Sequence, residues 1–238
     1  MSIKESATMA TDEGAPSKRV KLHYNDTIKV LAGSTEAPFT IHKDIVCAKS
    51  DFFAAACTGT WRESTDGVVR LPTVEADIVK LYVHWCYAND IEVDVLEAVQ
   101  MPSDKLVGHR DSRRRSTTQA LISLYVAANM LLDDHLKDCI MDEMIRLGSE
   151  KSFLFVSGSV QEVLDTLGTD SKIYIFIVDY IAARGLHRKS LAGGLVTFPP
   201  RFLAEVVVRM SEVSGKVKTN LEPGSGTVCR YHLCCKHG

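Results

Sequence analysis

The predicted elements indicate an α+β fold whose strands lie near the start of the chain. Residues 27–33 and 39–42 alternate apolar and polar side chains around a turn that contains Gly and Pro, which predicts a β-hairpin. A short apolar stretch, Val68–Leu71, predicts a third strand that Pro72 ends. Beyond it the apolar residues recur at helical spacing, so strands precede helices as in the α+β class.

Two short helices are predicted between the hairpin and the third strand. Residues 44–48 form the first, and Ser50 is suited to cap a second over 51–57. After the strand, Thr73 is expected to cap a longer helix that runs through Ala88. Two apolar stripes at helical spacing predict that this helix is buried on most sides. They comprise Val74, Ile78, Leu81, Trp85 and Ala88, and Val79, Val83, Cys86 and Tyr87.

The helical pattern breaks at residues 92–116, which show no sustained period and end in a basic cluster. We interpret this segment as a long loop or insertion. A capping box at 116–119 predicts the start of the next helix. Asp133 is expected to cap the helix after that, and Gly148 to end it. Its predicted buried face holds Leu136, Ile140, Met144 and Leu147.

Three more helices are predicted in the last third of the chain. A second capping box, 159–162, predicts a helix that reaches Leu167. Residues 173–184 show helical spacing, and residues 201–213 follow a Pro-Pro pair that suits a helix start.

Composition and charge restrict the class of protein. The chain has 238 residues, 45% hydrophobic and 24% charged, with a formal net charge of -2, so no global charge draws it to nucleic acid or a membrane. No apolar run approaches the ~20 residues that span a bilayer, and the polar N-terminus is unlike a secretory signal. Seven cysteines, four of them in apolar helical surroundings, fit a reducing compartment. We therefore expect an intracellular protein of the cytoplasm, the nucleus or both.

Taken together, these stretches resemble the BTB/POZ domain, and their sequences are closest to those of the stand-alone BTB proteins of filamentous fungi. The order and spacing of the pieces carry the resemblance. The pieces are IKVLAG at 28–33, FTIHKDIV at 39–46, SDFF at 50–53, WRES at 61–64, VRLP at 69–72, YVHWCY at 82–87 and LYVAANML at 124–131.

The resemblance implies a BTB/POZ fold over residues 25–148, with a small sheet capped by helical hairpins. A C-terminal helical extension is expected over 149–213. The polar, aperiodic residues 1–24 are expected to be disordered, and the linker-like residues 214–238 to form a flexible tail.

The function implied by the resemblance is protein–protein interaction without catalysis. We expect a homodimer formed through the N-terminal strand and first helices, which recruits a protein partner. In part of the family the partner is a cullin, and the BTB protein is a substrate adaptor for ubiquitin ligation. A nuclear transcription co-factor is the other alternative. The chain shows no kelch repeats, zinc fingers, MATH domain or ankyrin repeats to capture a substrate, and it inserts the basic segment before residue 117.

An enzyme is the competing interpretation of residues 38–53, which hold His42 and Cys47 among several other polar side chains. A Cys–His nucleophile would need both side chains adjacent and a third group to orient the base. The apolar residues of the segment are better explained as core, with His42 satisfying backbone groups. No phosphate-binding or hydrolase motif is found either, so we expect no catalytic residue, cofactor or resident metal.

Asp26 and Lys43 match positions that, in BTB transcription factors, form a charged pocket near the dimer interface. We take them as the candidate dimer or partner surface. The alternative is that they are two solvated charges, since exposed pairs contribute under ~1 kcal/mol. A functional pair should be partly buried and in contact.

Val95 and Glu97 are the candidate cullin contact. In some family members this contact uses a hydrophobic-x-acid triplet after the third major helix, and residues 95–97 (VLE) fit that pattern best.

Lys18, Arg19 and Lys21 follow Pro16 and are similar to a monopartite nuclear import signal. Such matches also arise by chance. A second basic cluster lies in the segment 105–116 and is either a solvated loop face or a site for phosphate or acidic groups.

The tail holds five soft metal ligands in nine residues: Cys229, His232, Cys234, Cys235 and His237. A structural zinc site normally draws two ligand pairs from separate segments. Only one cluster is present here, so we favour a disordered tail over a zinc site.

Overall fold

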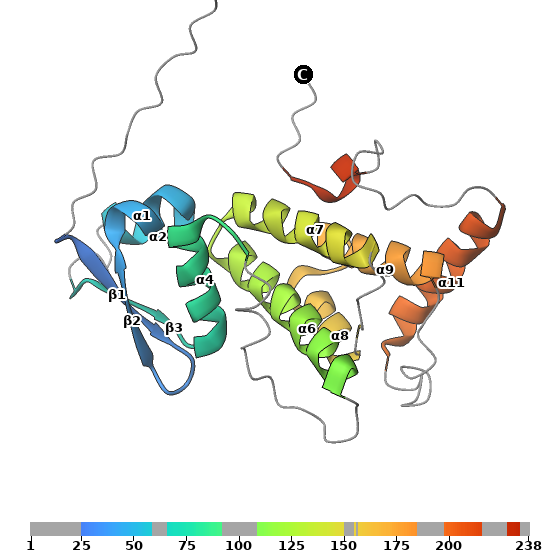
Figure 1. The fold of residues 1–238 in the computed structure, drawn as a ribbon, viewed down its shortest axis with the longest axis horizontal. Helices are drawn as coiled ribbons and strands as arrows, with labels where there is room; N and C mark the ends of the chain where they lie inside the picture. The colour runs from blue at the N-terminus through green and yellow to red at the C-terminus, as the bar shows by residue number, and fades with distance from the viewer. Residues whose placement is uncertain are drawn as a thin grey trace, which may run out of the picture.

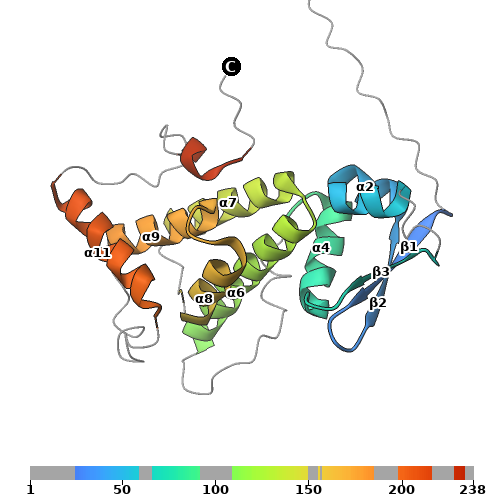
Figure 2. The same ribbon diagram turned by 180° about the vertical axis from the view of Figure 1, so that it is seen from behind.

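The computed structural model describes residues 25–58, 66–91, 109–149, 155, 157–184, 198–215 and 228–233. The molecule is elongated (Figures 1 and 2), with a small sheet at one end and a helical array that extends to the other. The order of strands and helices is the predicted α+β order. Within the described ranges, no helix combines the length and the apolar character that crossing a bilayer requires.

The sheet has three strands in the order β2-β1-β3. Strands β1 (Thr27–Ala32) and β2 (Ala37–His42) pair antiparallel, with Val30 opposite Phe39, which confirms the predicted hairpin. Strand β3 (Val68–Leu71) pairs parallel with β1. In β1 every second residue is buried, so one face of the sheet belongs to the core.

Helices α1 (Lys43–Lys49) and α2 (Asp51–Thr58) follow the hairpin directly. Ser50 lies between them, and its hydroxyl accepts the backbone N–H of Phe53 at 3.1 Å. That contact confirms the predicted helix cap. The same hydroxyl donates to the carbonyl of Leu131, which ties the two short helices to the long helices behind them.

Helix α4 begins two residues later than the sequence predicted. It spans Ala76–Ala88 with Glu75 as its first capping residue, so the prediction that Thr73 caps it was wrong. The Thr73 hydroxyl points to the sulfur of Met130 at 4.0 Å instead. The predicted apolar stripes were right for Ile78, Leu81 and Trp85 but wrong for Tyr87, which is 48% exposed.

Helix α6 (His109–Met130) reaches further toward the N-terminus than predicted. Residues 109–116 were expected to belong to a loop, and residues 116–119 to form a capping box. Both predictions were wrong, because these residues lie inside the helix. The segment lacks apolar periodicity, but Arg is a strong helix former. Gln119 is therefore not a capping residue, and its amide contacts helix α8 instead.

Helix α7 (Asp134–Ser149) begins at the predicted cap. The Asp133 carboxylate accepts the backbone N–H of Leu136 at 2.8 Å. The predicted face of four apolar residues is buried. The helix includes Gly148, so this residue is not the stop that we expected.

The C-terminal helices are α8 (Ser157–Leu167), α9 (Lys172–Arg184) and α11 (Pro200–Gly215). Helix α8 starts before the predicted capping box, so that box was wrong as a helix start. Its residues Ser159 and Glu162 bond to α6 instead, where Glu162 accepts from Gln119 at 2.8 Å and from Ser123 at 3.1 Å. Part of the expected flexible tail is ordered, because Val228–Tyr231 form the short helix η2, which packs on α9.

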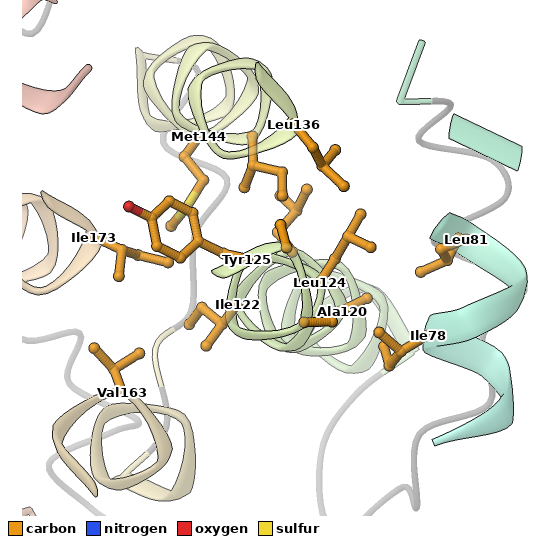
Figure 3. Packing of buried hydrophobic residues seen from close by; sticks show 14 of the residues in the cluster. Ile78, Leu81, Ala120, Ile122, Leu124, Tyr125, Leu136, Met144, Val163 and Ile173 are labelled. Carbon is orange, nitrogen blue, oxygen red and sulfur yellow. The ribbon is translucent and has the colours of Figure 1, made fainter. Parts of the chain in front are cut away.

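One continuous hydrophobic cluster runs from the sheet to α11. Helix α6 lies at its centre (Figure 3), with Ala120 and Leu124 directed toward Ile78 on α4. From the same helix, Ile122 and Tyr125 point to the other side, toward α8 and α9. The helices after residue 149 therefore share their core with the rest of the molecule.

Candidate functional site

The sheet end of the molecule carries a surface with many partly exposed apolar side chains. Ten of the fifteen residues of α1 and α2 are apolar, yet only Val46 and Phe53 are buried. Ile45, Phe52 and Cys57 are among those left half-exposed beside the core. Figure 1 shows both helices lying over one end of the sheet, away from the helical array. We call this the α1–α2 surface.

The predicted pair, Asp26 and Lys43, lies where β1 begins and α1 begins. The Lys43 ammonium is 2.8 Å from the Asp26 carboxylate, and the Lys43 backbone N–H donates to the Asp26 carbonyl at 2.9 Å. The register of the hairpin, which places Thr27 opposite His42, brings the two residues together. The hydrogen bond to Asp26 raises the pKa of Lys43. Lys43 is 28% and Asp26 55% exposed, so the pair is formed and half open to solvent beside the α1–α2 surface.

His42 and Cys47 are engaged in structural contacts. The His42 ring nitrogen Nδ1 lies 2.7 Å from the Tyr87 hydroxyl, which also accepts the His42 backbone N–H at 3.2 Å. The Cys47 thiol donates to the Phe53 carbonyl at 3.5 Å. Burial, together with the neighbouring Cys57, raises the pKa of Cys47 to about 12. A thiol with that pKa is protonated near neutral pH, which is the opposite of an activated nucleophile.

A second candidate surface is an open groove of about 260 Å³ between the C-terminal end of α4 and the outer face of α7. Trp85 and Ile91 contribute apolar walls, Asp90 and Asp142 give the rim a negative charge, and Arg146 pairs there with Glu143. Cys139 also lines it, and burial raises the pKa of this thiol to about 11. The groove is therefore suited to a partly apolar, partly basic partner surface rather than to thiol chemistry.

The family comparison covers the part of the chain that contains the sheet, α1, α2 and α4. The family model of the BTB/POZ domain matches residues 21–106. The chain carries a BTB/POZ domain. This confirms the predicted family and fold class, and BTB/POZ domains are protein-interaction modules that are generally not enzymes. Helices α6 and α7 lie beyond the match, so the BTB/POZ boundary at residue 148 stays a prediction.

Several predicted site residues of this chain lie outside the described residues. They are Val95 and Glu97 of the candidate cullin contact, Lys18, Arg19 and Lys21 of the candidate import signal, and Cys234, Cys235 and His237 of the tail. His232 is described, and its Nε2 lies 3.0 Å from the Asp142 carboxylate. Among the residues with described positions, no three His, Cys, Asp or Glu side chains gather as a metal site would require.

Sequence reasoning expected self-association through the first helices only from the family resemblance, and it missed the groove. The α1–α2 surface had a signal, since α2 reads DFFAAACT, which is too uniformly apolar for a helix that buries a single side chain. The groove had none, because it joins residues 85–91 to residues 139–146 from two helices.

Proposed function

We propose that this chain is a non-enzymatic BTB/POZ interaction module that self-associates through the α1–α2 surface, next to the start of strand β1, and thereby presents bound protein partners. The observation that carries the proposal is the partial exposure of eight of the ten apolar residues in α1 and α2. Apolar side chains left partly exposed in this number are typical of protein–protein contacts. Its burial against a second copy would gain roughly 25 cal/mol for each Å² removed from water.

The Asp26–Lys43 pair is proposed to orient that contact. The two charges lie next to α1, at the edge of the apolar surface, and they neutralise each other at 2.8 Å. Charges at the rim of an interface contribute specificity and register more than affinity. A second copy can therefore approach without meeting an unpaired charge, whereas like charges at this position would oppose the approach.

A charge-swap series tests the role of the pair. Asp26→Lys places two cations together beside the α1–α2 surface, and we expect it to weaken self-association by at least about tenfold. The double variant Asp26→Lys/Lys43→Asp restores the internal pair and should recover most of the loss. The matched control is Glu36→Lys, because Glu36 forms a similar exposed pair with Arg70, at 3.5 Å, beyond the other end of β1.

Sedimentation velocity gives the association constant of each variant, and thermal unfolding shows that each one folds. Equal effects of Asp26→Lys and Glu36→Lys would mean that Asp26 and Lys43 are merely two solvated charges. A normal fold with no self-association in the unsubstituted chain would contradict the proposal itself.

A second candidate function is that of substrate adaptor for a cullin-type ubiquitin ligase. The observation that favours it is the acidic groove at the end of α4, because Ile91 lines this groove and lies four positions before Val95 in the sequence. A pull-down with a purified cullin tests it. We expect Asp142→Lys to abolish binding and the exposed α8 control Asp165→Lys to leave it intact. No binding of the unsubstituted chain at micromolar concentration would refute the adaptor role.

A further inference from the structure

Helix α11, at the end of the molecule opposite the sheet, has an outward face without a partner among the described residues. Seven large hydrophobic side chains are exposed in the described ranges, and three of them lie within four consecutive positions of α11. They are Val207 at 65%, Val208 at 58% and Met210 at 44% exposed. Single exposed apolar residues are common, but such a cluster on one helix marks a contact surface.

The outward face is organised along the helix. At 100° per residue, Ala204, Val208 and Ser211 form a central stripe of small side chains, and all three are exposed. Val207 and Met210 lie on one flank of the stripe. Arg201 and Glu212 lie on the other flank, with their side chains 71% and 56% exposed. The opposite side of the helix is anchored in the core by Phe202 and Val206.

We propose that this face binds the same face of a second copy of the chain, with the two α11 helices antiparallel. A two-fold axis that relates two antiparallel helices brings each flank against the same flank of the partner. The apolar flank then meets an apolar flank. On the charged flank, Arg201, which pairs with Glu205 of its own helix, approaches Glu212 of the second helix, which pairs with Arg209 of that helix.

The charges decide between the two directions. A parallel pair related by a two-fold axis would instead set the charged flank of each helix, with Arg201 and Glu212, against the apolar flank of the other, and burying charges against apolar side chains is unfavourable. Centred on Val207 and Val208, the antiparallel pair sets Ala204 against Ser211 of the other copy. Small residues at these positions let two helix backbones approach closely.

A hollow beside the stripe suits this arrangement. It has a volume of about 280 Å³ and is lined by residues of α11 together with Val178 of α9. Val208 of the central stripe and Glu212 of the charged flank lie on its wall. A side chain from the second copy can enter it without displacing the core.

This contact goes beyond the proposed function, because it lies at the other end of the molecule from the α1–α2 surface (Figures 1 and 2). The exposed face between Arg201 and Glu212 is about 16 Å long at 1.5 Å per residue. That is small for a stable interface, so the contact by itself should be weak. Two separate two-fold contacts at opposite ends of one chain would join dimers into longer assemblies.

Cross-linking tests the arrangement. Ala204→Cys and Ser211→Cys are prepared as two full-length variants and oxidised mildly, alone and mixed in equal amounts. We expect an intermolecular disulfide between positions 204 and 211 in the mixture, identified by peptide mapping, and little 204–204 or 211–211 linkage. A preference for the like pairs would show a parallel contact. Absence of all three links at high protein concentration would refute self-association through α11.

The Val208→Glu variant gives an independent readout. It introduces a charge at the centre of the stripe, and Thr166→Glu on the exposed side of α8 is the matched control. We expect Val208→Glu to reduce the largest species seen by sedimentation to a dimer if the α1–α2 surface associates and to a monomer if it does not. The control should leave the distribution unchanged. If no cross-link forms, and Val208→Glu either leaves the distribution of species unchanged or fails to fold, self-association through α11 is refuted.

Discussion

Asp133 connects the two halves of the molecule at the level of a single side chain. It is fully buried, caps α7 through Leu136 and accepts the indole N–H of Trp85, on α4, at 3.0 Å. Burial raises its pKa above the usual value for Asp, although these hydrogen bonds oppose the shift. The residue was recognisable from the sequence as a cap, but its contact with Trp85, 48 residues away, was not.

Replacing Asp133 should therefore destabilise the fold. We expect Asp133→Ala to lower the free energy of unfolding by about 2–4 kcal/mol, because it removes a helix cap and leaves a buried indole N–H unpaired. Urea unfolding measures the loss. The control variant Asp165→Ala, at an exposed position of α8, should change the free energy of unfolding by less than about 0.5 kcal/mol. A loss as small as that of the control would contradict a structural role.

The raised pKa of Asp133 also gives a pH dependence with a defined sign. The folded state holds the proton more tightly than the unfolded chain, so this residue favours folding most below its unfolded pKa. That contribution is lost as the pH rises through the folded pKa. The stability difference between the unsubstituted chain and Asp133→Ala should therefore be larger near pH 4 than at pH 7. Urea unfolding at both pH values measures it, and a difference that grows toward pH 7 would reverse the inferred shift.

Cys47 offers a residue-level test of the non-enzymatic assignment. Because its pKa is raised to about 12, we expect it to react with iodoacetamide at pH 8 far more slowly in the folded protein than in urea. Mass spectrometry of labelled peptides over time measures both rates. Rapid labelling of folded Cys47 would indicate an activated thiol and reopen the enzyme interpretation.

At the scale of elements, local signals predicted the hairpin, β3 and the Ser50 cap, because each depends on neighbours in the sequence. The start of α6 could not be predicted from apolar spacing, since its first residues are mostly charged and polar. The formation of helix η2 could not be predicted from the local sequence either. Tyr231 is buried there because its hydroxyl donates to Asp179 on α9 at 2.8 Å, a partner 52 residues away.

Asp179 should control the docking of η2. It is 7% exposed and also lies 2.8 Å from Arg209 of α11 and 3.4 Å from Arg230 of η2. We expect Asp179→Ala to release residues 228–233, because it leaves these groups without their buried acceptor. Hydrogen exchange at the Leu233 amide reports the release, since this N–H donates to Asp138 of α7 at 2.7 Å. The control Asp165→Ala should keep that amide protected, and protection retained in Asp179→Ala would contradict the anchor.

At the scale of the whole molecule, one core joins the BTB/POZ region to the C-terminal helices, and the two partly apolar surfaces lie at opposite ends (Figure 1). The sequence resemblance implied self-association through the N-terminal end. It contained no signal for the α11 face, since exposure of Val207 and Val208 depends on which side of α11 meets α9. Under the two proposals, each molecule carries a contact surface at each end.

The most direct test of self-association through the α1–α2 surface is sedimentation equilibrium of the full chain carrying Val208→Glu, which removes the contribution of α11. Measurements at about 5 and 200 µM span the range in which weak and moderate dimers separate. We expect twice the mass of the chain at the higher concentration. A monomer at both concentrations, in a folded protein, would contradict the proposal.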